Sequence, residues 1–578
     1  MALFIDGLIV LVYFAGIISL GLYMGRRENS LHDFALGGRR VPWWAVMASL
    51  IAAETSAATF LGAPGEGYEN RSLAYVQLII GLILGRVLVG YVFLQPYYHY
   101  KVYTVYDYLA IRFGPWTRNY VSGLFLFMRT LASGSRMFVP SLVMVLAWGL
   151  LVHGRSERGF VPVTSVWPYI WAVVLLTVLT CLYTAVGGIK AVIWTDVIQA
   201  ALMFGAALVA ILTLLYHVGG DSFDLRRGFA AMTDAVPAMK TSAGYFLTGF
   251  EPAAVQKYMT ANHVAEMTPV HYVRLVLASP YTLFSATIAS TLGNMAAFGT
   301  DQDMVQRLLT AETYKKARRS LIIAAVMDFP IATAFTFIGI LLFVFYQKNP
   351  TWKPRENAHV FGSYILYVMP TGVRGLVLAG VFATAMGSLS AALNALATSA
   401  TNDWYIPYFA RQKSESHHVA AARAFTAVFA FLMIVIAGAF AYAVVRDPSV
   451  RIIPVVLGIA GFILGPMLGI FLLGMLTRNR GSDDGNMLAI TIGLITTIVL
   501  GGLHIYAANL IAPIFGSDQQ FRSPRWLPTV AFTWFPLIGA LVVFVVGMFF
   551  RTPESVIESA QRQAKGATHD DRPLALRD

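Results

Sequence analysis

The chain has 578 residues, of which 57% are hydrophobic and only 12% are charged, and its formal net charge is +12. A soluble protein of this length has roughly twice that charged fraction, so the composition excludes an ordinary soluble domain. The single cysteine excludes an internal disulfide and a cysteine-rich metal site. The basic residues lie between apolar runs, where membrane topology explains them without nucleic acid.

Runs of about 20 apolar residues recur along the whole chain and predict an all-α polytopic membrane protein. The first run, Leu3–Met24, is too long for the core of a signal peptide and is expected to remain as a span. In chain order we predict thirteen spans, near 3–24, 43–63, 73–95, 117–150, 165–185, 190–217, 276–298, 320–346, 374–403, 420–445, 452–477, 486–507 and 529–550.

Lysine and arginine are concentrated in every second connection between these spans. The basic set contains 25–42, 96–116, 300–319, 404–419, 478–485 and the C-terminal tail. Positively charged connections face the cytoplasm, so this set is expected inside. The N-terminus is then outside and the C-terminus inside, as an odd number of spans requires.

Two predicted spans in corresponding positions carry interruptions. The span at 43–63 is rich in small polar residues near its middle, and 276–298, five spans later, carries Ser279-Pro280 early. Paired interrupted helices indicate an inverted repeat with a binding site near the middle of the bilayer.

Six charged residues within predicted spans are singled out as candidates for a role in the membrane: Glu54, Arg86, Arg129, Arg136, Asp196 and Asp328. Each costs at least about 2.5–3.5 kcal/mol on insertion scales, so each needs a partner or a function. An interhelical salt bridge explains any one of them, and Arg86 and Asp328 are assigned to that structural role. Glu54 differs because it lies in SLIAAETSAATFLGAPG, residues 49–65, among alanines and hydroxyl residues.

The small residues around Glu54 indicate either a close packing seam or a helix that unwinds and frees carbonyl oxygens for a cation. A second stretch, FATAMGSLSAALNALATSATNDWY at 382–405, has Thr384 and Ser388 four residues apart on one helix face. Two such stretches in one membrane protein favour an oxygen-lined cation site. HExxH, GxSxG and P-loop motifs are absent, so no enzyme is predicted and transport would be driven by a gradient.

Five stretches carry a resemblance to a known family: FALGGRRVPWW at 34–44, the stretch ending in APGEGY at 63–68, YTAVGGIKAVIWTDVIQ at 183–199, FGTDQDMVQRLL at 298–309 and GLVLAGVFATAMGSLSAALNALATSATNDWY at 375–405. In order and spacing, residues 1–480 resemble the sodium:solute symporter family. The resemblance implies a five-plus-five inverted-repeat core of the leucine-transporter type. Its expected parts are an extra helix and loop at 1–42, repeats at 43–217 and 276–477, an extracellular connection at 218–275, extra helices at 478–550 and a cytoplasmic tail at 551–578.

The resemblance also implies a sodium site, and the positions of this chain that match it are Ala52, Thr55, Thr384, Gly387 and Ser388. Gly387 departs from the pattern, because the family usually has a hydroxyl residue there. Asp196 and Ser390 are implied on the sodium path or at a second sodium. Ala391 stands where sialic acid members carry a further hydroxyl.

The pocket pattern resembles the sialic acid branch, where an arginine of the fourth span binds the substrate carboxylate in a bidentate contact. The implied substrate-binding set is Glu54, Ser56, Thr59, Gln77, Arg136 and Arg129, with either arginine able to serve. The expected function is Na+-coupled import of a carboxylate-bearing solute such as a sialic acid. The alternatives are a sodium/sugar or polyol symporter and an uncoupled sensor or channel-like relative. A monomer in a bacterial inner membrane is expected, with sodium, the solute and the lipid bilayer as its partners.

Overall fold

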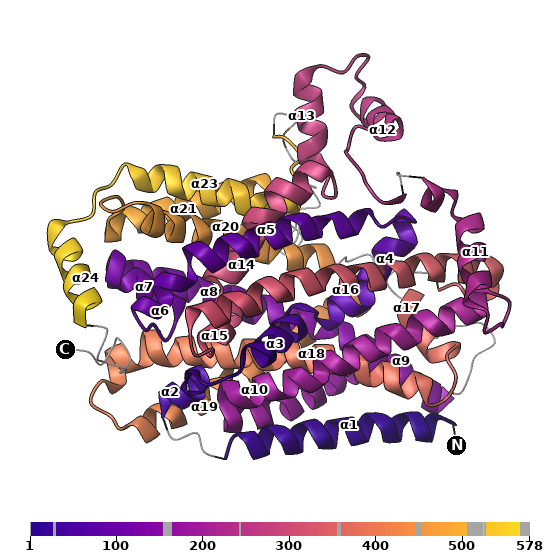
Figure 1. The fold of residues 1–578 in the computed structure, drawn as a ribbon, viewed down its shortest axis with the longest axis horizontal. Coiled ribbons are helices and arrows are strands. Elements are labelled where there is room, and N and C mark those ends of the chain that lie inside the picture. The colour runs from indigo at the N-terminus through magenta and orange to yellow at the C-terminus, as the bar shows by residue number, and fades with distance from the viewer. Residues whose placement is uncertain are drawn as a thin grey trace.

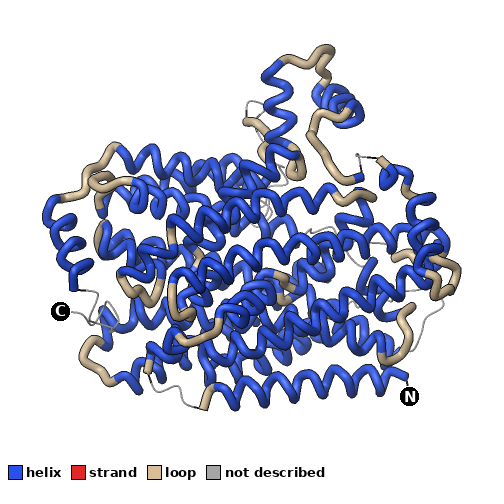
Figure 2. Tube along the Cα trace, viewed as in Figure 1, coloured by secondary structure: helices blue, strands red, loops and turns tan. Residues whose placement is uncertain are grey.

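The computed structural model describes residues 2–26, 30–153, 165–241, 244–354, 360–446, 452–505, 524 and 527–566. In these residues Figure 2 shows helices joined by loops and turns, without a strand. A helix satisfies its backbone hydrogen bonds within one segment, which the water-free hydrocarbon core requires. The prediction of an all-α protein is confirmed for the described residues.

Helices follow one another through the described residues (Figure 1). The first ten are α1 Ala2–Met24, α2 Leu31–Leu36, α3 Trp43–Glu54, α4 Ala57–Asn70, α5 Leu78–Val92, α6 Leu94–His99, α7 Val105–Arg112, α8 Pro115–Arg136, α9 Phe138–His153 and α10 Trp167–Val218. The next are α11 Leu225–Ala235, α12 Pro252–Asn262, α13 Pro269–Ala278, α14 Ser290–Thr300, α15 Gln302–Leu309, α16 Tyr314–Lys348, α17 Val360–Tyr367 and α18 Val373–Ser399. The last are α19 Glu415–Arg446, α20 Ile452–Leu476, α21 Asp483–Leu500, α23 Phe535–Met548 and α24 Glu554–Gly566.

Eight helical segments of the described residues are long and apolar enough to cross a membrane, and α3 with α4 adds a ninth when the bent pair counts as one span. The protein is therefore an integral membrane protein. The predicted total of thirteen spans and the orientation of the termini stay predictions. The end of the predicted span 486–507 and the tail residues 567–578 lie outside the described residues.

Helix α10 covers the predicted span 165–185 from Trp167 onward and the whole of the predicted span 190–217. Its 52 residues would measure about 78 Å at 1.5 Å per residue, more than twice the thickness of the hydrocarbon core. The helix is broken at Gly188, where φ is 52° and ψ is −152°. A Cβ atom there would lie 2.6 Å from the carbonyl oxygen of Phe34. Glycine allows both the left-handed backbone and this close approach.

Helix α18 lies at the centre of the bundle and α1 at its edge (Figure 1). In the most apolar window of each span, 89% of the residues in Val373–Ala410 are buried, against 17% in Phe4–Met24. Helix α18 packs against α10, α1, α19 and α8, and against both halves of the α3–α4 pair. A helix buried on all sides can carry polar groups, because its neighbours rather than lipid surround them.

The helices that fall in the predicted basic connections gather at one end of the bundle. Figure 1 shows α2, α6, α7, α15 and α24 at the end opposite the first turn of α1. These connections therefore lie on one side of the bundle, as alternate connections must, and the assignment of that side to the cytoplasm stays a prediction. Helices α12 and α13, from the predicted extracellular connection, project from the body of the protein.

Two glycines allow α4 and α16 to cross at backbone contact. A methyl group added to Gly339 would collide with the carbonyl oxygen of Pro64, and one added to Gly67 would collide with that of Thr336. We expect Gly339→Ala to lower the melting temperature of the purified protein by several degrees, because overpacking costs about 1–3 kcal/mol. Gly205→Ala is the matched control, since no atom lies within 4 Å of its added Cβ. Equal melting temperatures for the two variants would contradict the crossing.

Candidate functional site

The helix that carries Glu54 is interrupted, as the sequence predicts. Helix α3 ends at Glu54, α4 begins at Ala57, and the two halves are bent by 63°. Ser56 caps α4, its hydroxyl accepting a hydrogen bond from the Thr59 amide at 3.4 Å, a role that serine performs well. The Ser56 amide donates to the Glu54 carbonyl oxygen at 3.0 Å and not to the Ala52 carbonyl four residues back. The break therefore frees the Ala52 oxygen from the helix ladder.

The hydroxyl groups of α18 donate to their own helix. Thr384 donates to the Val381 carbonyl at 2.8 Å, and Ser388 donates to the Ala385 carbonyl at 3.1 Å. Each hydroxyl donates its hydrogen to a carbonyl of its own helix. The lone pairs of the hydroxyl oxygen therefore stay available to accept another hydrogen bond or to bind a cation. Ser390 is buried and donates to the Gly387 carbonyl at 3.0 Å in the same way.

Gly387 lies where the broken helix, α10 and α18 meet. A Cβ atom at this position would lie 3.6 Å from the Ala52 carbonyl oxygen and 3.3 Å from Asp196 Oδ1. The two polar stretches of the sequence, around Glu54 and Ser388, thus face each other. Ala52, predicted for the principal sodium site, and Asp196, predicted for the sodium path or a second sodium site, therefore both lie close to Gly387.

A buried ionic network connects Asp196 to the predicted cytoplasmic end. Oδ2 of Asp196 accepts hydrogen bonds from Ser49 at 2.6 Å and from Arg307 at 3.3 Å. Arg307 also pairs with Asp303 at 2.8 Å. Asp303 and Asp301 both pair with Arg129, Asp301 at 3.1 Å. Burial strengthens these interactions because the local dielectric constant is low.

Sequence reasoning did not assign roles to Arg307, Asp303 and Asp301. They lie in the stretch FGTDQDMVQRLL, where α15 places Asp303 and Arg307 one turn apart. The i, i+4 spacing of Asp303 and Arg307 on a helix indicates that these two side chains pair with each other. Their further partners, Arg129 on α8 and Asp196 on α10, are distant in sequence and could not be found in this way. The network ties α15 to both of those helices.

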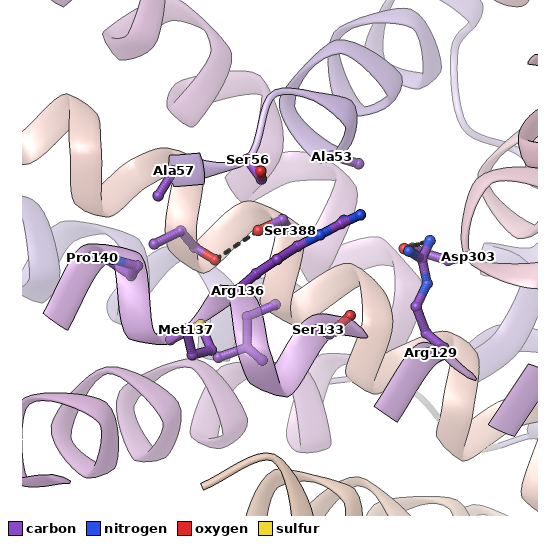
Figure 3. A pocket seen from close by; sticks show the side chains of 12 residues that line it. Ala53, Ser56, Ala57, Arg129, Ser133, Arg136, Met137, Pro140, Asp303 and Ser388 are labelled. Carbon is purple, nitrogen blue, oxygen red and sulfur yellow. Dashed lines mark hydrogen bonds and ion pairs between the residues drawn. The ribbon is translucent and has the colours of Figure 1, made fainter. Parts of the chain in front are cut away.

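A small cavity lies between the break and α18 (Figure 3). It is lined by Ala53, Ser56, Ala57, Arg129, Ser133, Arg136, Met137, Pro140, Asp303, Ala385, Ser388 and Leu389. The side chain of Arg136 extends across it toward Ala53. Arg136 is partly buried and forms no ion pair within the part of the chain that the structure describes. The cavity therefore contains one cationic group without a carboxylate partner.

The cavity distinguishes between the two candidate arginines. Arg129 is 6% exposed, and its guanidinium is already paired with Asp301 and Asp303. Arg136, nearly two helical turns further along, keeps its donors available. The predicted carboxylate contact therefore has a better candidate in Arg136 than in Arg129.

Three residues of the predicted substrate-binding set do not line the cavity. The Gln77 side-chain nitrogen donates hydrogen bonds to the Leu247 carbonyl at 3.1 Å and to the Tyr281 carbonyl. Its side-chain oxygen accepts a hydrogen bond from the Leu247 amide at 3.2 Å. Gln77 therefore binds the backbone of the predicted extracellular connection at Leu247. Thr59 lies in the first turn of α4, after the break, and its hydroxyl oxygen is 3.5 Å from that of Ser56. Glu54 pairs with Arg86 of α5. Its role in binding substrate stays a prediction, as do those of Gln77 and Thr59.

Glu54 forms a second ionic cluster with Arg86 and Asp328. Arg86 is fully buried, pairs with Glu54, and lies 2.8 Å from the Asp328 carboxylate. Its guanidinium stacks on Phe298, 3.8 Å from the ring centre. The cluster joins the broken helix to α5, α14 and α16. The structural role assigned to Arg86 and Asp328 fits this arrangement.

Comparison with known proteins gives a consistent result. The family model named sodium:solute symporter family matches residues 34–493. The chain is 26% identical over 550 residues to the sodium/sialic acid symporter SiaT of Proteus mirabilis, covering 94% of each chain. It is 26% identical over 490 residues to the sodium/sialic acid symporter NanT of Aliivibrio fischeri, covering 84% of this chain and 85% of that protein.

The fold is also similar to a solved structure. A Na+-coupled sialic acid symporter in a substrate-bound, outward-open state matches with a TM-score of 0.71 at 23% identity, covering 94% of this chain and 97% of that one. This likeness supports the fold, and the family match extends over well more than half of the chain. The chain belongs to the sodium:solute symporter family.

Proposed function

We propose that the protein couples sodium entry to the import of a carboxylate-bearing solute of the sialic acid type. The observation that carries the proposal is Arg136, a cation that faces a buried cavity without a carboxylate partner. A guanidinium binds a carboxylate through two parallel, charge-assisted hydrogen bonds. The named relatives that transport sialic acid with sodium support the same solute class.

The cation is proposed to bind between the broken helix and α18. Ala52 and Thr55 offer backbone oxygens at the break, and Thr384 and Ser388 offer hydroxyl oxygens whose hydrogens are already donated. Asp196 adds a carboxylate oxygen beside Gly387. Sodium, a hard cation, favours such oxygen ligands, and its binding would hold the two helices together.

The charges around the cavity explain why the two ligands would bind together. The network of Asp196, Asp301 and Asp303 with Arg129 and Arg307 carries one negative charge in excess, and Arg136 carries one positive charge. Sodium alone, or a carboxylate alone, leaves the region charged, whereas both together leave it neutral. Two unit charges about 10 Å apart at an effective dielectric constant near 20 interact by about 1.7 kcal/mol, within the usual range of coupling energies.

Movement of the site between the two membrane faces is proposed to follow the inverted repeats 43–217 and 276–477. The partner of the α3–α4 break is the second interrupted helix, in which α13 ends at Ala278 before Ser279-Pro280 and α14 follows. Rocking of one group of helices against the other would open the cavity to each side in turn. On the predicted cytoplasmic side, the contacts of α15 with Arg129 and Asp196 would have to separate. A single chain holds all these parts, so a monomer in a bacterial inner membrane is proposed as the working unit.

Uptake into proteoliposomes tests the proposal. We expect accumulation of labelled N-acetylneuraminate with an inward sodium gradient, and inhibition by other carboxylates but not by the amide derivative. Equal flux in sodium, potassium and choline buffers would instead indicate the uncoupled alternative. Sodium-driven uptake of neutral sugars that carboxylates do not inhibit would indicate the sugar symporter.

A further inference from the structure

Gln199 lies on α10 one turn after Asp196 and is only 1% exposed. Residues three apart on a helix share a face, and both side chains approach Gly387 of α18. The motif YTAVGGIKAVIWTDVIQ ends at this glutamine, and neither the sodium site nor the substrate pocket described above uses it.

The orientation of the Gln199 amide is fixed by a tyrosine of α1. Its Nε2 donates to the Tyr13 hydroxyl at 3.3 Å. The Tyr13 hydroxyl donates its own hydrogen to the Met386 sulfur at 3.8 Å, so toward Gln199 it acts as the acceptor. With the nitrogen held by Tyr13, the carbonyl oxygen of the amide turns toward Gly387.

Three oxygens without donors converge at Gly387. A Cβ atom on this glycine would lie 2.7 Å from Gln199 Oε1, 3.3 Å from Asp196 Oδ1 and 3.6 Å from the Ala52 carbonyl oxygen. Both side-chain oxygens are buried and have no hydrogen-bond partner among the described residues. Buried acceptors that face one another without a hydrogen between them are unfavourable, and a cation removes the penalty.

We propose that Gln199 Oε1 is a direct ligand of the sodium ion, replacing the hydroxyl that the family pattern has at position 387. The inference deepens the proposed function and rests on it. The 2.7 Å separation means that a side chain at position 387 and this orientation of Gln199 exclude each other. Glycine at 387 therefore makes room for the amide oxygen, and the site keeps its number of oxygen ligands.

Sodium binding to the purified protein without solute provides the test, with 22Na+ or the sodium-induced rise in melting temperature as the signal. We expect Gln199→Leu, which keeps the volume and removes the oxygen, to weaken sodium affinity by at least about tenfold, the equivalent of one charge-assisted contact. Gln199→Glu keeps an oxygen at the same place with added charge, and we expect it to bind sodium more tightly than the wild type. If Gln199→Leu cannot be purified, Gln199→Glu alone decides: unchanged or weaker binding overturns the proposal.

Two further variants separate a ligand from a structural role. Gly387→Ser added to Gln199→Leu restores a hydroxyl, and we expect it to recover most of the lost affinity. Tyr13→Phe removes the anchor of the amide nitrogen but keeps the oxygen, and we expect a loss of no more than about threefold, less than a lost charge-assisted contact. A loss in Tyr13→Phe equal to that in Gln199→Leu, or wild-type affinity in Gln199→Leu, overturns the ligand assignment and leaves a bound water between the oxygens. Absence of sodium binding in the wild type would instead refute the proposed function.

Discussion

Replacing Arg136 by alanine is expected to abolish solute uptake while the protein still binds sodium. The substrate carboxylate would enter a buried cavity without its cationic partner, and loss of one member of a buried charge pair costs about 2–5 kcal/mol. The apparent affinity for the solute should fall by at least about 30-fold. Uptake and equilibrium binding of labelled N-acetylneuraminate in the presence of sodium measure the effect.

The same variant gives a second, opposite signal. Without Arg136 the negative charge of the Asp196 network is no longer balanced, so sodium should bind more tightly in the absence of solute. Met137→Leu, a volume-conserving change in the cavity wall, is the control and should alter neither affinity strongly. Arg136→Lys should recover part of the uptake, because it restores the charge without the planar, bidentate geometry. Unchanged uptake in Arg136→Ala would show that the carboxylate binds elsewhere.

Replacing Arg86 by methionine is expected to destabilise the fold more than any surface change. The variant leaves Glu54 and Asp328 without their common partner, with Arg86 itself 0% exposed in the native protein. Breaking a buried pair by removing one partner costs about 3–5 kcal/mol. We expect a large fall in melting temperature and in the yield of folded protein.

The compensated variant distinguishes charge from packing. Combining Arg86→Met with Glu54→Gln and Asp328→Asn removes the whole charged set, and replacing a complete buried set is often nearly neutral. We therefore expect the triple variant to melt close to the wild type, measured by fluorescence in the same detergent. A triple variant as unstable as Arg86→Met would show that the stacking of Arg86 on Phe298 matters more than the ion pairs.

The helical segments and their interruptions were accessible from the sequence because they depend on local properties. Apolar length predicts a span. Small hydroxyl residues around Thr55 and Ser56 predict an interruption, and the structure adds that Ser56 caps the second half. Ser279-Pro280 predicts the second break in the same way, and α13 ends just before it. The separation of five spans between the two breaks predicted which of them correspond.

The pairing of charges was not accessible from the sequence. Six charged residues within predicted spans were singled out, but the sequence offered each of them several possible partners of opposite charge and no reason to prefer one. Asp196 lies 111 residues from Arg307, and Arg129 lies 174 residues from Asp303. Whether such residues meet depends on how helices turn and pack, which no local pattern encodes. The choice between Arg136 and Arg129 followed only once the aspartates of α15 were seen to engage Arg129.

By itself, the sequence determined that this is an integral membrane protein of helices, that two of them are interrupted, and that oxygen-rich stretches lie around Glu54 and Ser388. These features follow from hydrophobicity, helix caps and residue size, which act over a few residues. Only the tertiary structure decided which charges neutralise one another, that Arg136 faces the cavity unpaired, and that Gln199 reaches Gly387. Electrostatic energy in a membrane depends on distances between groups far apart in the chain, and the packing of the helices sets those distances.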